Sequence, residues 1–242
     1  MAKIDLSKPV NVETESNVAL IYAKSGGGKT VNSTLVRTGK RGKNLLLCSD
    51  NSYVVLRNFP RPNLDIETIE HWMDETPNGK KQECFNDQFE RAVASKQYDN
   101  IIVDNVSDLF DMAILELDAS GRYKDMRQAY QLVYQNLKRL VRAAGSVDCG
   151  VIFTAWHETE EITLTSGQKA QRVKPKLPMK ILDNFLGLCN IVAYINTAEK
   201  NGETRYYYHL VGAETMYAKD QLLNRKTCLP EDIFTGKEPE KK

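Results

Sequence analysis

One stretch of eight residues decides the fold expected for this chain: Ala23-Lys24-Ser25-Gly26-Gly27-Gly28-Lys29-Thr30. It matches the phosphate-binding loop motif, with Ala23 in the place of the usual first glycine. Apolar β-forming residues 18–22 precede it, and residues 30–37 follow with a helical pattern. A strand that leads through a glycine-rich turn into a helix directs backbone N–H groups to one point, where a nucleotide triphosphate carries its charge. The alternative is a chance glycine-rich turn before a helix.

Two side chains of this loop are expected to act on a bound nucleotide. Lys29 would reach the β- and γ-phosphates, and the Thr30 hydroxyl would ligate Mg²⁺. ATP and Mg²⁺ are therefore the expected cofactors. Lys24 either faces solvent or reaches the nucleotide of a second subunit.

The composition is that of an ordinary globular protein. The 242 residues include 41% apolar and 27% charged residues and carry a net charge of +1, which suits one α/β domain. Five scattered cysteines without a Cys-x-x-Cys pair favour reduced thiols. No apolar leader and no membrane-spanning run are found, which predicts a cytoplasmic protein (in the host cytoplasm if phage-encoded) without a membrane partner.

Buried strands alternate with amphipathic helices, which predicts an α/β fold with a mainly parallel sheet flanked by helices. The strands are expected at residues 18–22, 44–48, 64–69, 100–103 and 150–154, and the main helices at residues 82–95 and 128–144. After Trp156 the pattern favours two antiparallel hairpins, around Ser166-Gly167 and Asn201-Gly202. The expected organisation is residues 1–17 packed on the core, one domain over residues 18–235, and a charged tail at residues 236–242.

Three polar side chains follow buried strands. Because the carboxyl ends of parallel strands meet at one edge, Asp104, Asp50 and His157 are expected near the phosphate loop. Asp104 would complete the Mg²⁺ shell with Thr30, or else cap the next helix. Asp50 would orient the attacking water, because Asn105 cannot act as a base, or else it begins a turn. His157 would sense the γ-phosphate, or else it is a polar residue at a strand exit.

A basic segment follows the last of these strands. Between residues 169 and 180 no acid occurs, and five side chains are basic: Lys169, Arg172, Lys174, Lys176 and Lys180. Such a loop beside a nucleotide sensor would bind a nucleic-acid backbone. The alternative is a solvated charged surface.

Together these features resemble the RecA-type ATPase core, and more closely the compact phage ATPases that are similar to single-strand annealing recombinases. Four segments carry the resemblance: residues 23–30, Leu46–Asp50, Tyr98–Asn105 and Thr154–Glu158. A fifth, residues 218–221, is similar to a late Lys-Asp-Arg element with Gln221 in place of arginine. The resemblance implies a RecA-like fold in which Lys219 reaches the γ-phosphate of a neighbouring subunit, or Arg225 compensates.

The resemblance also implies partners and an activity. Head-to-tail assembly would give a ring or filament with ATP at the subunit interfaces, bound to single-stranded DNA. A single-strand-binding protein is a further expected partner. The expected function is DNA-stimulated ATP hydrolysis in phage-type recombination. Two alternatives stay open: a non-catalytic or slow nucleotide switch that controls dimer or partner assembly, and a small-molecule kinase, for which Arg172 is the only arginine of the basic segment.

Overall fold

A computed structural model describes residues 17–200 and 202–235 of the chain. The predictions for an N-terminal segment packed on the core and for a charged tail therefore fall, except for Asn17, outside the described residues. None of the described helices combines the length and the apolar composition needed to cross a membrane. All five cysteines are free thiols, and only Cys149 is not fully buried.

The centre of the described molecule is a mixed, mainly parallel sheet with the order β10-β8-β7-β1-β5-β4-β2-β3. The parallel part contains β1 (Val18–Ala23), β2 (Asn44–Cys48), β3 (Leu64–Thr68), β4 (Asn100–Asp104), the first part of β5 (Gly150–Thr163) and β7 (Ile191–Lys200). Every residue of β1, β2 and β4 is buried, because both faces of these strands are covered. The predicted fold class is confirmed.

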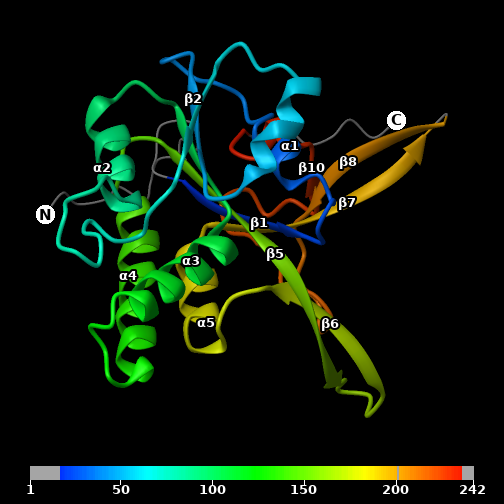
Figure 1. Ribbon diagram of the computed structural model, residues 1–242. Helices are drawn as coiled ribbons and strands as arrows, with labels where there is room; N and C mark the ends of the chain where they lie inside the picture. The colour runs from blue at the N-terminus through cyan, green and yellow to red at the C-terminus, as the bar shows by residue number, and fades with distance from the viewer. Residues whose placement is uncertain (1–16, 201, 236–242) are drawn as a thin grey trace, which may run out of the picture.

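The two faces of the sheet are covered differently. One face packs against α2 (Phe85–Ser95), α3 (Val106–Ala119), α4 (Met126–Ala144) and α5 (Met179–Leu188), which together with the sheet form the larger apolar core (Figure 1). The other face carries the short helix α1 (Lys29–Ser33), the 3₁₀ helix η1 (Asn51–Asn58) and the C-terminal turn η2 (Pro230–Asp232). The sequence patterns did not predict α5 or η1.

Helix α1 is shorter than predicted. It ends at Ser33 rather than near Arg37. The hydroxyls of Ser33 and Thr34 both donate to the carbonyl oxygen of Thr30, at 3.2 and 3.0 Å. Such local side-chain bonds compete with helix continuation, which explains the early end.

Two antiparallel hairpins project from the body (Figure 1). Strand β5 continues beyond the sheet and pairs with β6 (Lys169–Pro175), and β7 pairs with β8 (Glu203–His209). The second turn contains Gly202, whose φ of +79° lies in the left-handed region that glycine tolerates. Both predicted hairpins are present. The short strands β9 (Lys219–Asp220) and β10 (Thr227–Cys228) add to β7 and β8.

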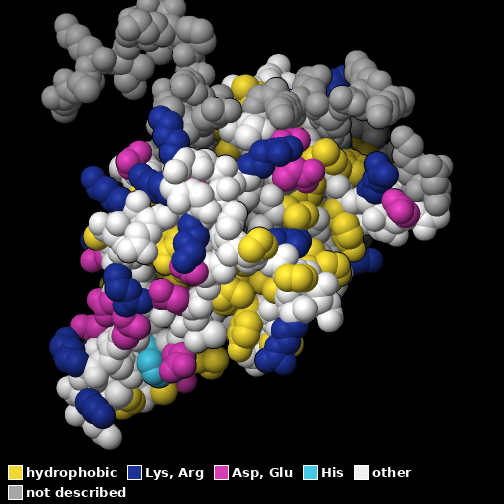
Figure 2. Space-filling model, turned by 90° about the horizontal axis from the view of Figure 1, so that it is seen from above, with side chains coloured by type: hydrophobic (Ala, Val, Ile, Leu, Met, Phe, Trp, Pro, Cys, Tyr) yellow, Lys and Arg dark blue, Asp and Glu magenta, His cyan; other side chains and the backbone are white. Residues whose placement is uncertain are grey.

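Charge is distributed without a large patch of one sign on the face seen in Figure 2, where basic and acidic side chains are interspersed and hydrophobic side chains gather between them. A net charge of +1 agrees with this mixture. A nucleic-acid surface, if this chain has one, is therefore not a broad basic face on this side of the molecule.

Candidate nucleotide-binding site

The glycine-rich loop joins β1 directly to α1. Gly26 and Gly28 have φ values of +70° and +79°. At Gly27, an added Cβ would lie 2.9 Å from both the carbonyl oxygen of Lys24 and the Cβ of Ala23. All three positions therefore require glycine, two for backbone conformation and one for space. The result is a tight turn suited to a close approach of phosphate to the backbone.

Lys29 closes this loop from inside. Its Nζ donates to the carbonyl oxygen of Lys24 at 3.2 Å, and the residue is 7% exposed. Burial lowers the pKa of Lys29, while the carboxylates of Asp104 and Asp50 oppose this shift. An ammonium group held here between the loop and two acids can exchange its carbonyl partner for a phosphate oxygen. Lys24 is exposed, which fits its solvent-facing alternative.

Asp104 lies at the end of β4, beneath the loop, and is 1% exposed. Its Oδ2 accepts hydrogen bonds from the hydroxyls of Thr30 (2.5 Å) and Ser52 (3.0 Å), and its Oδ1 accepts one from Thr154. Burial raises the pKa of Asp104, and these hydroxyl bonds favour its ionised form. The structure thus brings Asp104 and Thr30 together, as predicted.

The pair of Thr30 and Asp104 fits Mg²⁺. A hydroxyl and a carboxylate are oxygen ligands, and Mg²⁺ in nucleotide sites takes few protein ligands, with phosphates and water completing its shell. Among the described residues no group of three or more His, Cys, Asp or Glu side chains could hold a metal ion. A site that uses one protein carboxylate is consistent with that finding.

Asp50 lies beside Asp104, at the end of β2. Its Oδ1 accepts from the backbone N–H of Ser52 at 2.7 Å, which caps η1, and its Oδ2 accepts from Nδ2 of Asn105 at 3.0 Å. Ser52 therefore contacts both carboxylates. Asp50 thus begins a turn, as one of its two alternatives predicted. The hydrogen bonds of that turn also fix its carboxylate beside the predicted metal site. The Asp104–Asn105 peptide bond is cis.

His157 follows the buried part of β5. Its Nδ1 lies 3.4 Å from the Tyr194 hydroxyl, and the two rings are parallel with centroids 6.1 Å apart. Burial lowers the pKa of His157, and the positive charges of Lys29 and Lys24 lower it further. The charges of the phosphate-loop lysines therefore act on the imidazole, and together with burial they favour its neutral form.

The predicted basic loop is a strand paired with acids, which the sequence of residues 169–180 alone does not reveal. Lys174 is 6% exposed and its Nζ lies 2.8 Å from Glu160 and 3.5 Å from Glu158 on β5. Burial disfavours the charged form of Lys174 and acts to lower its pKa. The two carboxylates act in the opposite direction with the larger combined effect, so the pKa is raised. The charge of Lys174 is thus paired with those of Glu158 and Glu160 across the hairpin, and Lys174 is not available to DNA in this conformation.

The other basic side chains of the segment differ in their partners. Lys169 pairs with Glu161 at 2.7 Å, and Lys176 lies 3.4 Å from Asp111 and over the ring of Trp156. Arg172 lies 3.6 Å from Glu160 and donates to the Tyr217 hydroxyl at 2.9 Å. Lys180 makes no ion pair among the described residues. Of the five basic residues, Lys180 is thus the one whose charge has no acidic partner among the described residues.

The late Lys-Asp-Gln element lies on β9, which pairs with β7 rather than contacting the phosphate loop. Nζ of Lys219 donates to Gln221 at 3.2 Å, and burial lowers its pKa. A role for Lys219 in trans stays a prediction. Arg225 cannot compensate: it is 3% exposed, pairs with Asp220 at 2.7 Å and donates to the carbonyl oxygens of three residues, Asp232, Ile233 and Thr235. That alternative is wrong, because the guanidinium is committed to the fold.

Three site residues escaped the sequence analysis. Ser52 and Thr154 donate to Asp104, but serine in a turn and threonine in a strand carry no distinct signal. Tyr206 on β8 packs over the loop, with ring atoms 3.1 and 3.4 Å from the position of a Cβ on Gly28. Its proximity depends on the strand order, which places β8 two strands from β1.

Comparison with known proteins identifies a family for this chain. The chain matches the AAA domain family over residues 15–222. Among solved structures it is similar to a KaiC-like protein from the hyperthermophilic archaeon Pyrococcus horikoshii OT3, with 14% identity, 86% of this chain and 87% of that chain covered, and a TM-score of 0.45. No curated protein matches the sequence. Since the family match spans most of the chain and includes the whole phosphate loop, the protein belongs to the AAA domain family of nucleotide-binding ATPases.

Proposed function

We propose that the protein binds ATP with Mg²⁺, hydrolyses it, and acts on single-stranded DNA as a recombination ATPase of the phage type. The observation that carries the ATPase part is the meeting of Lys29, Thr30 and Asp104 under one glycine loop, with Asp50 fixed beside them. Phosphoryl transfer needs little more than positioning and charge neutralisation, and these residues supply both.

The roles follow from position. Lys29 would bind phosphate oxygens, and Thr30 with Asp104 would hold Mg²⁺, which when bound neutralises charge on the β- and γ-phosphates. The Asp50 carboxylate would orient the attacking water and accept its proton, while the water oxygen bonds to the γ-phosphorus and the bond from the γ-phosphorus to the ADP oxygen breaks. His157, on the neighbouring strand end, would contact the γ-phosphate and pass its state to the β5–β6 hairpin.

The strand order also orients the nucleotide. Asp104 and Asp50 lie on the β5-β4-β2 side of β1, and Tyr206 lies on the opposite, β7-β8 side. With the γ-phosphate toward the acids, the nucleoside would extend toward β8. Tyr206 is the aromatic ring that lies against the loop there, and we assign it as a stacking surface for the base.

The DNA part, the head-to-tail assembly and the single-strand-binding protein partner rest on the sequence resemblance. The ion pairs of Lys169, Lys174 and Lys176 reduce the charge that the β5–β6 hairpin offers to a phosphate backbone. The slow nucleotide switch is the second candidate, favoured by Asn105 in place of an acid after Asp104. In a switch, ATP would bind tightly and turn over negligibly.

The deciding experiment measures steady-state ATP turnover without DNA, with single-stranded DNA and with duplex DNA, and particle size alongside. The Lys29→Ala variant is expected to lose turnover and keep its fold. Lys24→Ala, an exposed lysine in the same loop, is the matched control and should retain turnover. Turnover by Lys29→Ala at the parent rate would remove the ATPase assignment, and tight ATP binding by the parent protein without turnover would favour the switch.

A further inference from the structure

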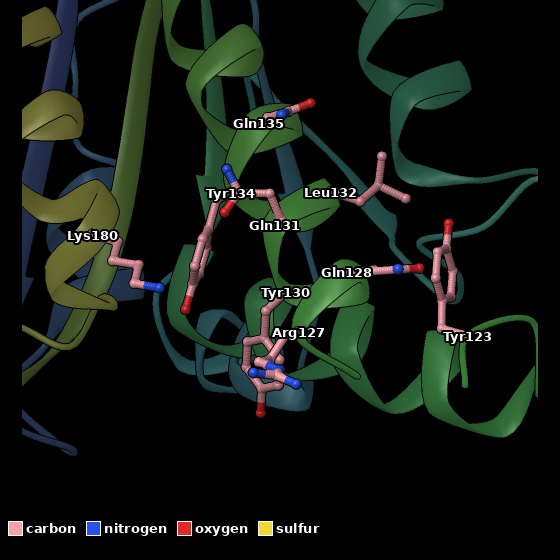
Figure 3. A pocket seen from close by; sticks show the side chains of 9 residues that line it. All are labelled: Tyr123, Arg127, Gln128, Tyr130, Gln131, Leu132, Tyr134, Gln135 and Lys180. Carbon is pink, nitrogen blue, oxygen red and sulfur yellow. The ribbon is translucent and has the colours of Figure 1, made fainter. Parts of the chain in front are cut away.

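We propose that a tyrosine-lined groove along α4 binds the bases of single-stranded nucleic acid, an inference that rests on the proposed DNA function and assigns it a surface. The groove encloses about 820 Å³ and is lined by residues of α4 together with Tyr123 and Lys180 (Figure 3). We call it the α4 groove. It lies on the helical face of the sheet, away from the β5–β6 hairpin strands where DNA contacts were expected from sequence.

The aromatic rings of the groove form a supported platform. Tyr134 is stacked on Phe110 of α3, with centroids 6.0 Å apart and an interplanar angle of 9°. Tyr130 is tilted against both rings at 6.1 and 6.2 Å. Phe110 is 9% exposed and belongs to the core, whereas Tyr130 is 38% exposed. These tyrosine rings pack against the core on one side and are accessible to solvent on the other. Unpaired bases stack on aromatic surfaces of this kind.

The polar groups of the groove are uncommitted. In the described part of the chain, no hydrogen bond is found for the amides of Gln128, Gln131 and Gln135, or for the hydroxyls of Tyr130 and Tyr134. Amide side chains placed beside aromatic rings can bind the donor and acceptor edges of bases. Free polar groups at an exposed helix surface therefore suit a ligand that combines flat rings with hydrogen-bonding edges.

The charge of the groove favours a polyanion. Lys180 and Arg127 are its charged lining residues, and no acid lines it. Arg127 pairs with Asp125 at 2.9 Å, but both side chains are exposed, so a phosphate can compete for it. Figure 3 shows Lys180 at one end and Tyr123 at the other, with Tyr134, Tyr130 and Arg127 between them.

The same lining offers little aliphatic surface to a partner helix. Leu132 is the sole aliphatic side chain that lines the groove. A helix face that docks a protein presents an apolar stripe of aliphatic residues at helical spacing. Here the stripe that carries Ala129, Val133 and Leu137 is buried toward the core, and the exposed side carries tyrosine, glutamine and arginine.

Helix α3 joins the groove to the nucleotide site. Asn105 caps this helix by accepting from the N–H of Asp108 at 2.8 Å, and the same side chain holds Asp50. Phe110, on the same helix, supports Tyr134 and Tyr130. A strand bound in the groove would therefore contact residues supported by the helix whose N-cap, Asn105, positions the candidate water-orienting carboxylate of Asp50.

Fluorescence anisotropy of the full chain with ATP and Mg²⁺ tests the proposal, with a labelled oligothymidine and an abasic oligomer of the same length as probes. The parent protein should bind the oligothymidine and bind the abasic oligomer much more weakly. Tyr130→Ala should weaken oligothymidine binding roughly 5- to 150-fold, while Tyr130→Phe retains the ring and the affinity. Tyr207→Ala, a tyrosine on β8 outside the groove, is the matched control.

Salt dependence gives a second readout that does not depend on the ring. Lys180→Ala should reduce the slope of log affinity against log salt by about 0.7. Lys80→Ala, which removes an exposed lysine outside the groove, should leave the slope unchanged. This pair keeps the test valid if Tyr130→Ala fails to fold, which a thermal melt reports.

The outcomes separate the groove from the proposed function. If the parent binds DNA but Tyr130→Ala and Lys180→Ala bind it equally well, the groove assignment is wrong and the DNA function stands. If the parent binds no DNA, both are wrong. A smaller particle for Tyr130→Ala with unchanged DNA affinity would make the groove a contact between copies of this chain and overturn the proposal.

Discussion

The side-chain amide of Asn105 donates to Oδ2 of Asp50 at 3.0 Å, so the residue after Asp104 holds the carboxylate that follows the neighbouring strand β2. Asn105 is buried, and its side-chain oxygen Oδ1 caps α3 by accepting from the backbone N–H of Asp108. The side-chain amide of Asn105 is therefore held at its oxygen by α3, and its nitrogen holds the carboxylate of Asp50. This arrangement lets a chain without an acid after Asp104 still present a positioned carboxylate at the site.

Asp50→Asn is expected to lower ATP turnover by about 100-fold or more while leaving ATP affinity nearly unchanged, because asparagine keeps the shape but loses the base. Steady-state turnover and calorimetric ATP binding measure the two effects. Asp111→Asn is the matched control, since Asp111 lies on α3 and pairs with Lys176. Equal turnover of Asp50→Asn and the parent protein would assign water orientation to another group.

Asp104 makes the stability of the ligand-free protein depend on pH. Burial raises its pKa above the ordinary value, so its contribution to stability is present below the unfolded-state pKa and is lost as pH rises through the folded-state pKa. Asp104→Asn removes this titration. We measure the unfolding free energies of both proteins in urea, without nucleotide or Mg²⁺. The value for Asp104→Asn minus the value for the parent protein is expected to increase as pH rises from acid to neutral.

Groups remote from Asp104 titrate equally in both proteins, so the difference between the two curves reports Asp104 together with the neighbours, such as Lys29, on which its charge acts. A difference that stays constant with pH would show that the carboxyl has the same pKa in the folded and unfolded chains. Asp104→Asn should at the same time lose Mg²⁺-dependent ATP binding. Stability and nucleotide binding are thus expected to change in opposite directions.

Tyr206→Ala is expected to weaken ATP binding by roughly 5- to 150-fold through the loss of base stacking, and to leave the binding of inorganic tripolyphosphate unchanged. The tripolyphosphate measurement reports whether the loop itself is intact, because it lacks a base. Tyr206→Phe should bind ATP as the parent protein does. Tyr207→Ala, on the opposite face of the same strand, provides the control. An equal loss for both ligands would give Tyr206 a structural role in the loop.

The sequence predicted the parts of the site that depend on local chemistry. The phosphate loop needs glycine at three neighbouring positions and a lysine after them, and few other folds require that pattern. Asp104 and Asp50 were found because acids after buried parallel strands must meet at one edge of the sheet. Their contact through Ser52 and Asn105 could not be predicted, because it depends on the register of β2 against β4.

The charge environment of the basic segment could not be predicted from its own residues. Read alone, residues 169–180 carry only positive charge, but β5 pairs with β6 so that Glu158 lies opposite Lys174 and Glu160 opposite Arg172. The neutralising acids lie 12 to 16 positions earlier in the chain, beyond the reach of a local charge count. Arg225 was misjudged for a similar reason: arginine is rarely buried, and only the tertiary fold supplies Asp220 and three carbonyl oxygens to it.

Arg225→Ala is expected to destabilise the fold by about 3–5 kcal/mol, because it leaves the buried Asp220 carboxylate without its partner. The carbonyl oxygens of Asp232, Ile233 and Thr235 also lose their donor, so the C-terminal turn that covers the second face of the sheet should loosen. Urea unfolding measures the loss. Lys226→Ala changes the next residue, which is exposed, and should stay within about 0.5 kcal/mol of the parent protein. Equal unfolding free energies of Arg225→Ala and the parent protein would show that the buried ion pair between Arg225 and Asp220 contributes nothing to the stability of the fold.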